Sequence, residues 1–150
     1  MSTNDVNVTL QEITEETLGD ILDLEVAEDQ KGFVAPNVRS IAQAHFSEHA
    51  WFRAIYAGDT PVGFVMLYAD EEKPWYGVWR FMVDERHQRM GYASKAMQLV
   101  VEHVRGLPGA KELFLSYVPK EGSALPFYEK CGFVETGEWH GQEKEMKLTL

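Results

Sequence analysis

Cysteine is nearly absent from this sequence of 150 residues, because Cys131 is the only one. A lone cysteine cannot close an internal disulfide, which favours a reducing compartment. Long apolar runs are also missing: nothing approaches the roughly 20 residues of a membrane span, and the first seven residues carry no signal-peptide pattern. The composition, 45% hydrophobic and 25% charged, is typical of a globular chain. We therefore expect one domain over residues 1–150, located in the cytoplasm and without membrane contact.

Lysine and arginine are absent from the first 30 residues, which hold nine acids: Asp5, Glu12, Glu15, Glu16, Asp20, Asp23, Glu25, Glu28 and Asp29. The whole chain has a net charge of −10, so this segment supplies most of the excess. Phosphate binding needs a basic face, so nucleic acid is not expected as a partner. The acids are compatible with a cationic small molecule, or with a solvated helix that aids solubility, and charge alone favours the second.

Hydrophobic periodicity predicts alternating strands and helices along the whole chain. Helices are expected over residues 14–28, 38–48, 91–104 and 125–131. Strands are expected over residues 6–13, 51–57, 62–68, 75–83, 113–118, 133–135 and 144–150. This order predicts an α/β fold with a mixed central sheet of six to seven strands and four helices, antiparallel at first and with a βαβ crossover later.

Two familiar nucleotide-binding motifs are missing: the three-glycine dinucleotide fingerprint and the P-loop. Instead, a strand ends at Val83, a polar loop follows, and a helix begins near Gly91, with the pattern Gln88-x-x-Gly91-x-Ala93 between them. The start of a helix offers unpaired N–H groups and the positive end of its dipole. Such a turn is suited to an anion, especially a pyrophosphate.

This turn resembles the [R/Q]-x-x-G-x-[G/A] loop that binds acetyl-CoA in the GNAT superfamily of N-acetyltransferases. Downstream, the segment from Ala124 to Phe133 is similar to the second signature of that superfamily, A-x-x-[F/L]-Y-E-K-x-G-F. The two motifs follow in the family's order and at a matching distance. The resemblance implies a GNAT acyl-CoA N-acyltransferase fold and transfer of an acetyl group from acetyl-CoA directly to an amine, without a metal. Superfamily analogy also suggests a homodimer.

The resemblance also implies roles for individual residues. Tyr128 would act as the acid toward the coenzyme A thiolate; the other interpretation is a packed ring between Phe127 and Phe133. Many relatives have an asparagine where this chain has Glu121, so that contact with the pantetheine arm is not expected here. The expected acetyl-CoA contacts are Phe81, Met82, Val83, Gln88, Arg89, Met90, Gly91, Tyr92, Ala93, Ser94 and Lys130.

The acceptor is predicted from the first expected helix, where Glu25 falls on the apolar face formed by Leu18, Ile21 and Leu22. A carboxylate on a buried stripe needs a partner, such as a cationic ligand, unless the helix end is simply ragged. The segments 25–37, 61–67 and 79–83 resemble the bacterial spermine/spermidine acetyltransferases. The resemblance implies a polyamine acceptor, spermidine or spermine, bound by Glu25, Glu28, Asp29, Phe33, Trp75 and Tyr76.

Several points stay open at this level. The cofactor strand has no carboxylate, so the general base is unassigned; a water relay ending at Glu25 is one candidate. The five histidines form no zinc pattern with a third ligand. Another acceptor, such as an amino acid, an aminoglycoside or a protein N-terminus, would fit the same chemistry. A non-catalytic acyl-CoA sensor would also retain the fold.

Overall fold

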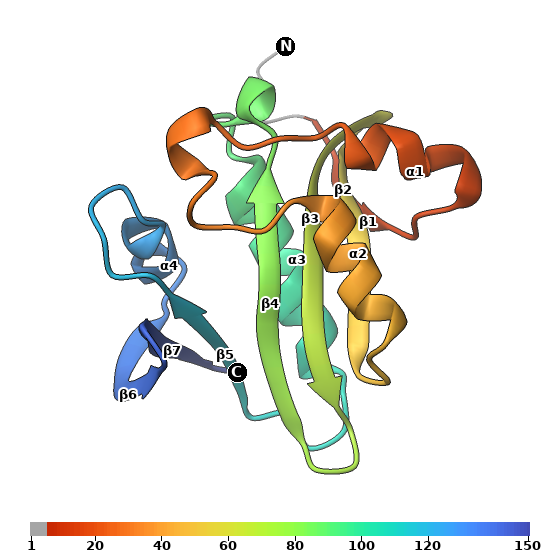
Figure 1. Cartoon of the computed structure of the whole chain (residues 1–150). Helices are drawn as coiled ribbons and strands as arrows, with labels where there is room; N and C mark the ends of the chain where they lie inside the picture. Colours follow the sequence, from red (N-terminus) through yellow and green to blue (C-terminus); the bar gives the residue numbers. More distant parts are fainter. Residues whose placement is uncertain (1–5) are drawn as a thin grey trace.

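The computed structural model describes residues 6–150 and forms one seven-stranded sheet in the order β1-β2-β3-β4-β5-β7-β6 (Figure 1). Asp5, one of the N-terminal acids counted above, lies outside the described residues. The strands are β1 (Val8–Gln11), β2 (Ala50–Ala57), β3 (Thr60–Asp70), β4 (Trp75–Val83), β5 (Glu112–Tyr117), β6 (Val134–His140) and β7 (Glu143–Thr149). The helices are α1 (Glu15–Leu22), α2 (Asn37–His45), α3 (Tyr92–Arg105) and α4 (Leu125–Lys130), with short 3-10 turns η2 (Glu28–Gln30) and η3 (Glu85–His87).

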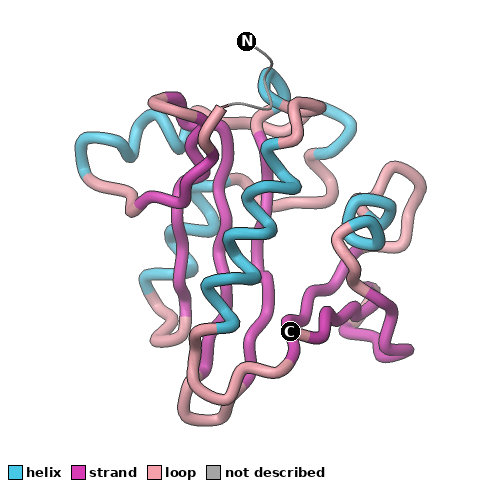
Figure 2. The backbone as a smooth tube through the Cα atoms, turned by 180° about the vertical axis from the view of Figure 1, so that it is seen from behind, coloured by secondary structure: helices cyan, strands magenta, loops and turns pink. Residues whose placement is uncertain are grey.

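Helices cover both faces of the sheet. The helices α1 and α2 lie on one face, and α3 lies on the other, where Figure 2 shows it in front. The face of α3 that meets the sheet carries Ala96, Met97, Val100 and Val104, all buried and spaced at helical intervals. A smaller core beneath α1 and α2 contains Ile21. Within residues 6–150, no helix is long and apolar enough to cross a bilayer.

The sheet opens between its two central parallel strands. β3 and β4 pair along their whole length, whereas β4 and β5 pair only at Gly77 and Phe114. One extra residue sits in β4: Met66 pairs with Arg80 and Leu67 with Val78, which leaves Trp79 between them. A bulge of this kind bends a strand and increases its twist. Beyond it β4 and β5 diverge, as Figures 1 and 2 both show.

The structure confirms the predicted fold class, the mixed sheet and the number of helices. The predicted first helix is too long, however, because α1 ends at Leu22 rather than near residue 28. The reason is tertiary: Leu24 is buried, and both backbone groups of Glu25 bond elsewhere, its N–H to Asp84 and its carbonyl to the Glu85 N–H. The second helix also ends three residues earlier than expected, at His45.

Candidate active site

A cleft of about 1340 Å³ occupies the opening between β4 and β5. Its walls come from the segment between η2 and α2, from β3, β4 and β5, from the start of α3, from α4 and from the β6–β7 hairpin. The two motifs that begin at Gln88 and Ala124 are far apart in the sequence, and both line this cleft. The predicted site residues that line it are Phe33, Trp75, Phe81, Val83, Gln88, Arg89, Ala93 and Tyr128.

The N-terminus of α3 has the backbone geometry expected of an anion site. Gly91 is its N-cap with φ +81°, a conformation that glycine adopts without strain, and Arg89 is also left-handed with φ 64°. Within residues 6–150 no side chain caps this helix, so its first N–H groups have no such partner there. A Cβ added at Gly91 would meet no atom within 4 Å, so the space above the turn is open. These features fit the diphosphate of acetyl-CoA.

The side chains of the other residues predicted to contact acetyl-CoA lie away from the cleft. Tyr92 is buried in the core that α3 shares with the sheet, and Met82 is buried in the smaller core on the opposite face. Met90 and Ser94 do not line the cleft, and Lys130 is exposed on α4 outside it. A ligand along this loop and strand would therefore meet peptide groups from these positions.

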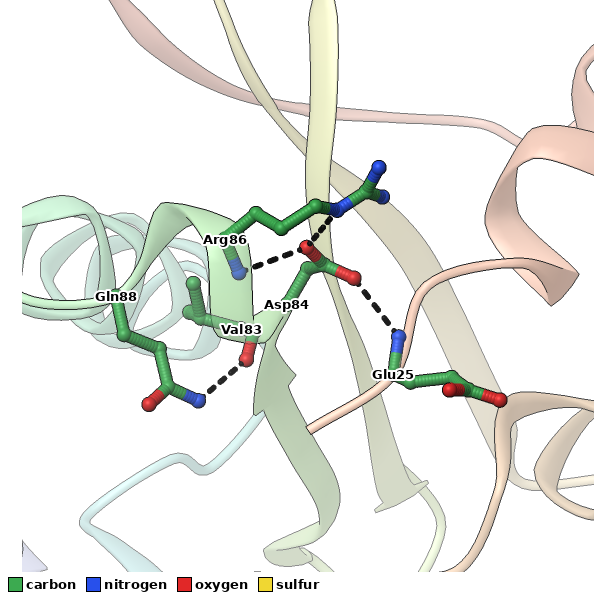
Figure 3. A network of polar contacts seen from close by, with 5 residues as sticks. All are labelled: Glu25, Val83, Asp84, Arg86 and Gln88. Atoms are coloured by element: carbon green, nitrogen blue, oxygen red, sulfur yellow. Dashed lines mark hydrogen bonds and ion pairs between the residues drawn. The ribbon is translucent and has the colours of Figure 1, made fainter. Parts of the chain in front are cut away.

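A buried carboxylate fixes the loop between β4 and α3. Asp84 is 2% exposed; its Oδ1 accepts from the N–H of Glu25 at 2.9 Å, and its Oδ2 accepts from N–H and Nε of Arg86 at 3.1 and 2.9 Å (Figure 3). Burial alone raises the pKa of Asp84, but the bonds from Arg86 and Glu25 outweigh it, so the pKa lies below its usual value. Asp84 thereby ties the α1–α2 segment to the anion-binding loop.

Gln88 makes a second tie between the same segments. Its Nε2 donates to the carbonyl oxygen of Val83 and to Oε1 of Gln30, both at 2.8 Å. In Figure 3 the Gln88 side chain turns back toward the end of β4. The motif glutamine therefore braces the loop in this structure, and Gln30 was not expected from sequence because its partner is 58 residues away.

Tyr128 lines the cleft and is largely buried. Its ring packs near Phe127 and Phe133, with ring centroids 5.7 and 6.2 Å away, and Phe133 N–H donates to its carbonyl oxygen. Burial, followed by the nearby Cys131 thiol and Glu143 carboxylate, raises the pKa of Tyr128 to about 12. The hydroxyl is thus a hydrogen-bond donor throughout the neutral range. The ring packs as the second interpretation expects and also lines the cleft, and the role of Tyr128 as an acid stays a prediction.

Aromatic rings form one wall of the cleft. Trp75 stacks on Phe114 with centroids 5.4 Å apart, and Tyr68 meets Trp75 and Trp79 edge-on at 5.8 and 6.3 Å. Trp75 was predicted here. Tyr68, Trp79 and Phe114 were missed because only the bulge in β4 and the parallel pairing with β5 bring these rings together.

Two carboxylates from β7 reach the cleft, and sequence analysis missed both. Glu143 accepts from Ser116 Oγ at 3.2 Å. Glu145 lies 2.6 Å from His140 Nε2 and accepts from Thr136 Oγ1 at 2.9 Å. The alternation of Glu143 and Glu145 places both on one face of a strand, and this was the signal available. The alternation does not show which part of the molecule this face meets, because nothing in the sequence predicts that β7 pairs with β5.

The predicted acceptor acids lie elsewhere. Glu25, Glu28 and Asp29 are exposed and do not line the cleft. Glu25 and Glu28 pair with Lys31 at 3.8 and 3.0 Å. Since the helix ends before Glu25, the expected apolar face does not extend to it, and Figure 3 shows its carboxylate directed away from Asp84.

Tyr76 also differs from expectation. It is 1% exposed, and its hydroxyl donates to the carbonyl oxygen of Pro108 at 2.5 Å. It faces the α3 side of the sheet, in the core, because strand alternation turns it away from the face that carries Trp75. Its ring is not available to a ligand, so the prediction of Tyr76 as a substrate contact is wrong.

The fold and the cleft define an acyltransferase architecture, and sequence comparison agrees. Residues 12–133 match the model of the acetyltransferase (GNAT) family, so the chain belongs to this family and is an acetyltransferase. Spermine/spermidine N(1)-acetyltransferase of Bacillus subtilis strain 168 is 28% identical over 142 residues, which cover 89% of this chain and 91% of the relative. A probable spermine N(1)-acetyltransferase of Bacillus subtilis subsp. natto is 27% identical over the same length.

Solved structures share the fold. An acetyltransferase of Bacillus subtilis in complex with CoA superposes with a TM-score of 0.70 at 18% identity, covering 97% of this chain and 99% of that one. A domain from Methanocaldococcus jannaschii superposes with a TM-score of 0.76 at 14% identity, covering 97% and 100%. At these identities the likeness concerns architecture alone.

Proposed function

We propose that this acetyltransferase transfers the acetyl group of acetyl-CoA to a primary amine of a small polycation of the spermidine and spermine class. The observation that carries the proposal is the pairing of aromatic rings with the carboxylates Glu143 and Glu145 in one cleft. Aromatic faces attract alkylammonium groups, and carboxylates pair with them. The names of the two curated relatives support the same acceptor.

Acetyl-CoA would occupy the part of the cleft near α3. The N–H groups that begin α3 suit its diphosphate, with Arg89 adding positive charge. Beyond Gly77, β4 has no strand beside it on the β5 side, so its peptide groups can bond an extended pantetheine arm as an added strand would. The bound carrier supplies an activated acetyl thioester.

The protein's part in the reaction is to orient the amine and manage protons. An alkylammonium has a pKa of about 10.4, so only about one molecule in 10³ is neutral at pH 7. The ammonium loses one proton to water, its neutral nitrogen bonds to the acetyl carbon, and the carbon–sulfur bond breaks. The nitrogen then loses its second proton to water, which leaves a neutral amide. Coenzyme A leaves as a thiolate, and the Tyr128 hydroxyl donates a hydrogen bond or its proton to that sulfur.

One observation favours a second candidate acceptor. Arg39 and Arg80 also line the cleft, and a guanidinium binds carboxylates well. An amino acid would offer both an amine and a carboxylate. With an amino acid as acceptor, Arg39 and Arg80 would bind its carboxylate; with a polyamine, they would have no such partner on the substrate.

A thiol-release assay with a panel of amines tests the proposal. We expect turnover with spermidine or spermine at higher kcat/KM than with amino acids, an aminoglycoside or an N-terminal peptide. Turnover with amino acids and none with polyamines would replace the first candidate by the second. Binding of coenzyme A without turnover of any amine would indicate a sensor.

A further inference from the structure

Arg80 is a cation in the cleft that the sequence motifs do not explain. Its Nη1 donates to the carbonyl oxygen of Trp79 and its Nη2 to Oε1 of Gln43, both at 3.0 Å. Its Nε is buried and has no hydrogen-bond partner within residues 6–150. Over the same residues, no carboxylate lies within ion-pair distance of this guanidinium. A partly buried charge without a contacting counter-ion is costly, so its presence calls for a reason.

The guanidinium is held close to the bulge in β4. The bond to the Trp79 carbonyl folds the side chain back on its own strand, and the guanidinium carbon lies 5.9 Å from the centre of the Trp79 ring. The bond to Gln43 fixes it from the opposite side, on α2. The bulge is where β4 turns away from β5 and the cleft begins. With the pantetheine arm along β4 as proposed above, an amine approaching the thioester would pass near this charge.

The charged groups around Arg80 come from each wall. Arg39 on α2 adds a second cation, and Glu143 on β7 acts across the cleft. β4 and β3 contribute the rings of Trp79 and Tyr68. Burial lowers the pKa of Arg80, Glu143 raises it, and Arg39 lowers it, so that the net shift is downward. The side chain nevertheless stays charged, because a guanidinium in a protein keeps its proton.

The carboxylates and the cation thus lie on different walls. Glu143 and Glu145 belong to β7, with Glu145 already bonded to His140, and Arg80 belongs to β4. A polyamine has several ammonium groups, so the remote ones can lie by β7 while one nitrogen enters beside β4. A cation beside that nitrogen disfavours its charged form.

We propose that Arg80 sets the protonation state of the acceptor: its guanidinium repels the ammonium form of the entering nitrogen and so favours the neutral amine that attacks the acetyl carbon. This rests on the proposed function, in that the acceptor must be an amine that is protonated in solution. The proton lost from nitrogen passes to water, and no further reactant is required. The same repulsion opposes binding of the charged substrate, so Arg80 weakens ground-state binding and promotes the reaction.

The test compares Arg80→Met, which removes the charge, with Arg80→Lys, which keeps it. With spermidine at saturation, the acidic limb of kcat reports ionisation in the bound complex. We expect Arg80→Met to move this limb up by about one pH unit and to lower kcat at pH 7 by about tenfold, while KM for spermidine falls or stays equal. Arg80→Lys should restore the limb. An unmoved limb in Arg80→Met, or a raised KM for spermidine with an unmoved limb, would overturn the proposal.

A binding measurement checks the same point without turnover. Calorimetry of spermidine binding to the protein saturated with coenzyme A, run at pH 8 in two buffers of different ionisation enthalpy, counts the protons released. The wild type should release more protons than Arg80→Met, and equal release would contradict the proposal. Equal affinity for coenzyme A and equal melting temperature show that the variants are folded.

The outcomes separate this inference from the choice of acceptor. If the wild type turns over another amine and not spermidine, the polyamine proposal fails, and the pH series is run with that amine. If that amine carries a carboxylate and Arg80→Met raises its KM with an unmoved limb, Arg80 binds the carboxylate and the inference fails by itself.

Discussion

Two tyrosines of this chain show how much a single side chain depends on its surroundings. Tyr76 and Tyr128 are both packed among apolar groups, and burial raises the pKa of each. The Tyr76 hydroxyl donates to the carbonyl of Pro108 in the core, whereas Tyr128 lines the cleft. The first hydroxyl stabilises the fold, and the second is available to a ligand.

Replacing each tyrosine by phenylalanine should separate these roles. We expect Tyr128→Phe to lower kcat by about 10²-fold with an almost unchanged affinity for coenzyme A, because a positioned proton donor is lost. Tyr76→Phe should lower the free energy of unfolding by about 1 kcal/mol and leave kcat unchanged. Steady-state kinetics with urea unfolding of both variants measures this. Equal kcat in Tyr128→Phe and wild type would return Tyr128 to a packing role.

The raised pKa of Tyr128 also has a consequence for the pH profile. A pKa of about 12 keeps the hydroxyl protonated up to strongly alkaline pH. We therefore expect no loss of kcat from Tyr128 ionisation between pH 7 and pH 10, and any alkaline limb in that range should persist in Tyr128→Phe. Kinetics of both proteins over this range provides the measurement. A limb present in the wild type and lost in the variant would contradict the assignment.

Asp84 gives a prediction for stability against pH. An amide at this position would turn its NH₂ toward a donor, either Glu25 or Arg86, so Asp84→Asn should destabilise the protein at pH 7 by about 1–3 kcal/mol. The folded-state pKa of Asp84 is lowered, so its contribution is present above the unfolded value of about 3.9 and is lost as pH falls through the folded value.

The gap between wild type and Asp84→Asn should therefore narrow from pH 7 to pH 3, as measured by urea unfolding. Glu28→Gln is the matched control, because its carboxylate is exposed and pairs only at the surface with Lys31. A gap of constant size across this range would show that ionisation of Asp84 does not stabilise the fold.

At the scale of elements, the N-terminus of α3 offers a clean comparison. Gly91 and Gly58 both have positive φ, +81° and +60°, and a Cβ at either would meet no atom within 4 Å. Alanine at each should cost about 1 kcal/mol of stability through backbone strain alone. Neither glycine lines the cleft; Gly91 begins α3 beside the cleft residues Arg89 and Ala93, whereas Gly58 lies in the β2–β3 turn.

We expect Gly91→Ala to weaken coenzyme A binding by at least tenfold, because its methyl group enters the space proposed for the diphosphate. Gly58→Ala should bind coenzyme A as the wild type does. Calorimetric titration of the two variants measures this. Equal affinities would place the diphosphate elsewhere.

Elements also show what could be predicted from the sequence. Helix α3 and the loop before it followed from local signals: a strand end, Gly91 and an apolar stripe at helical spacing. The end of α1 did not, because its cause is a contact between Glu25 and Asp84, 59 residues apart. Glu143 and Glu145 were missed for a similar reason, since only the pairing of β7 with β5 brings them to the cleft. Local motifs thus predicted the residues proposed for the carrier, whereas the residues proposed for the acceptor depend on tertiary pairing.

At the scale of the whole molecule, the net charge of −10 should act on the acceptor from a distance. The exposed N-terminal acids, among them Glu28 and Asp29, lie outside the cleft and so can raise the local concentration of a polycation without contacting it. Such attraction is screened by salt, since the Debye length falls from about 30 Å at 0.01 M to about 10 Å at 0.1 M.

We therefore expect KM for spermidine to rise several-fold between these salt concentrations, with kcat nearly unchanged. In the double variant Glu28→Gln, Asp29→Asn the KM for spermidine should rise less. An uncharged solute added at equal osmolality should leave KM unchanged. Steady-state kinetics at each ionic strength gives the result. A KM for spermidine that is independent of salt would exclude long-range attraction.

Because β4 and β5 diverge, an unpaired strand edge lies in the middle of the sheet instead of at its outer strands. α4 and the segment between α1 and α2 line the cleft at this edge. The contacts proposed there for acetyl-CoA come from main-chain atoms, which are the same in nearly every amino acid. Side chains that face the amine could then be substituted without loss of affinity for acetyl-CoA, so the same fold can accommodate different amine acceptors.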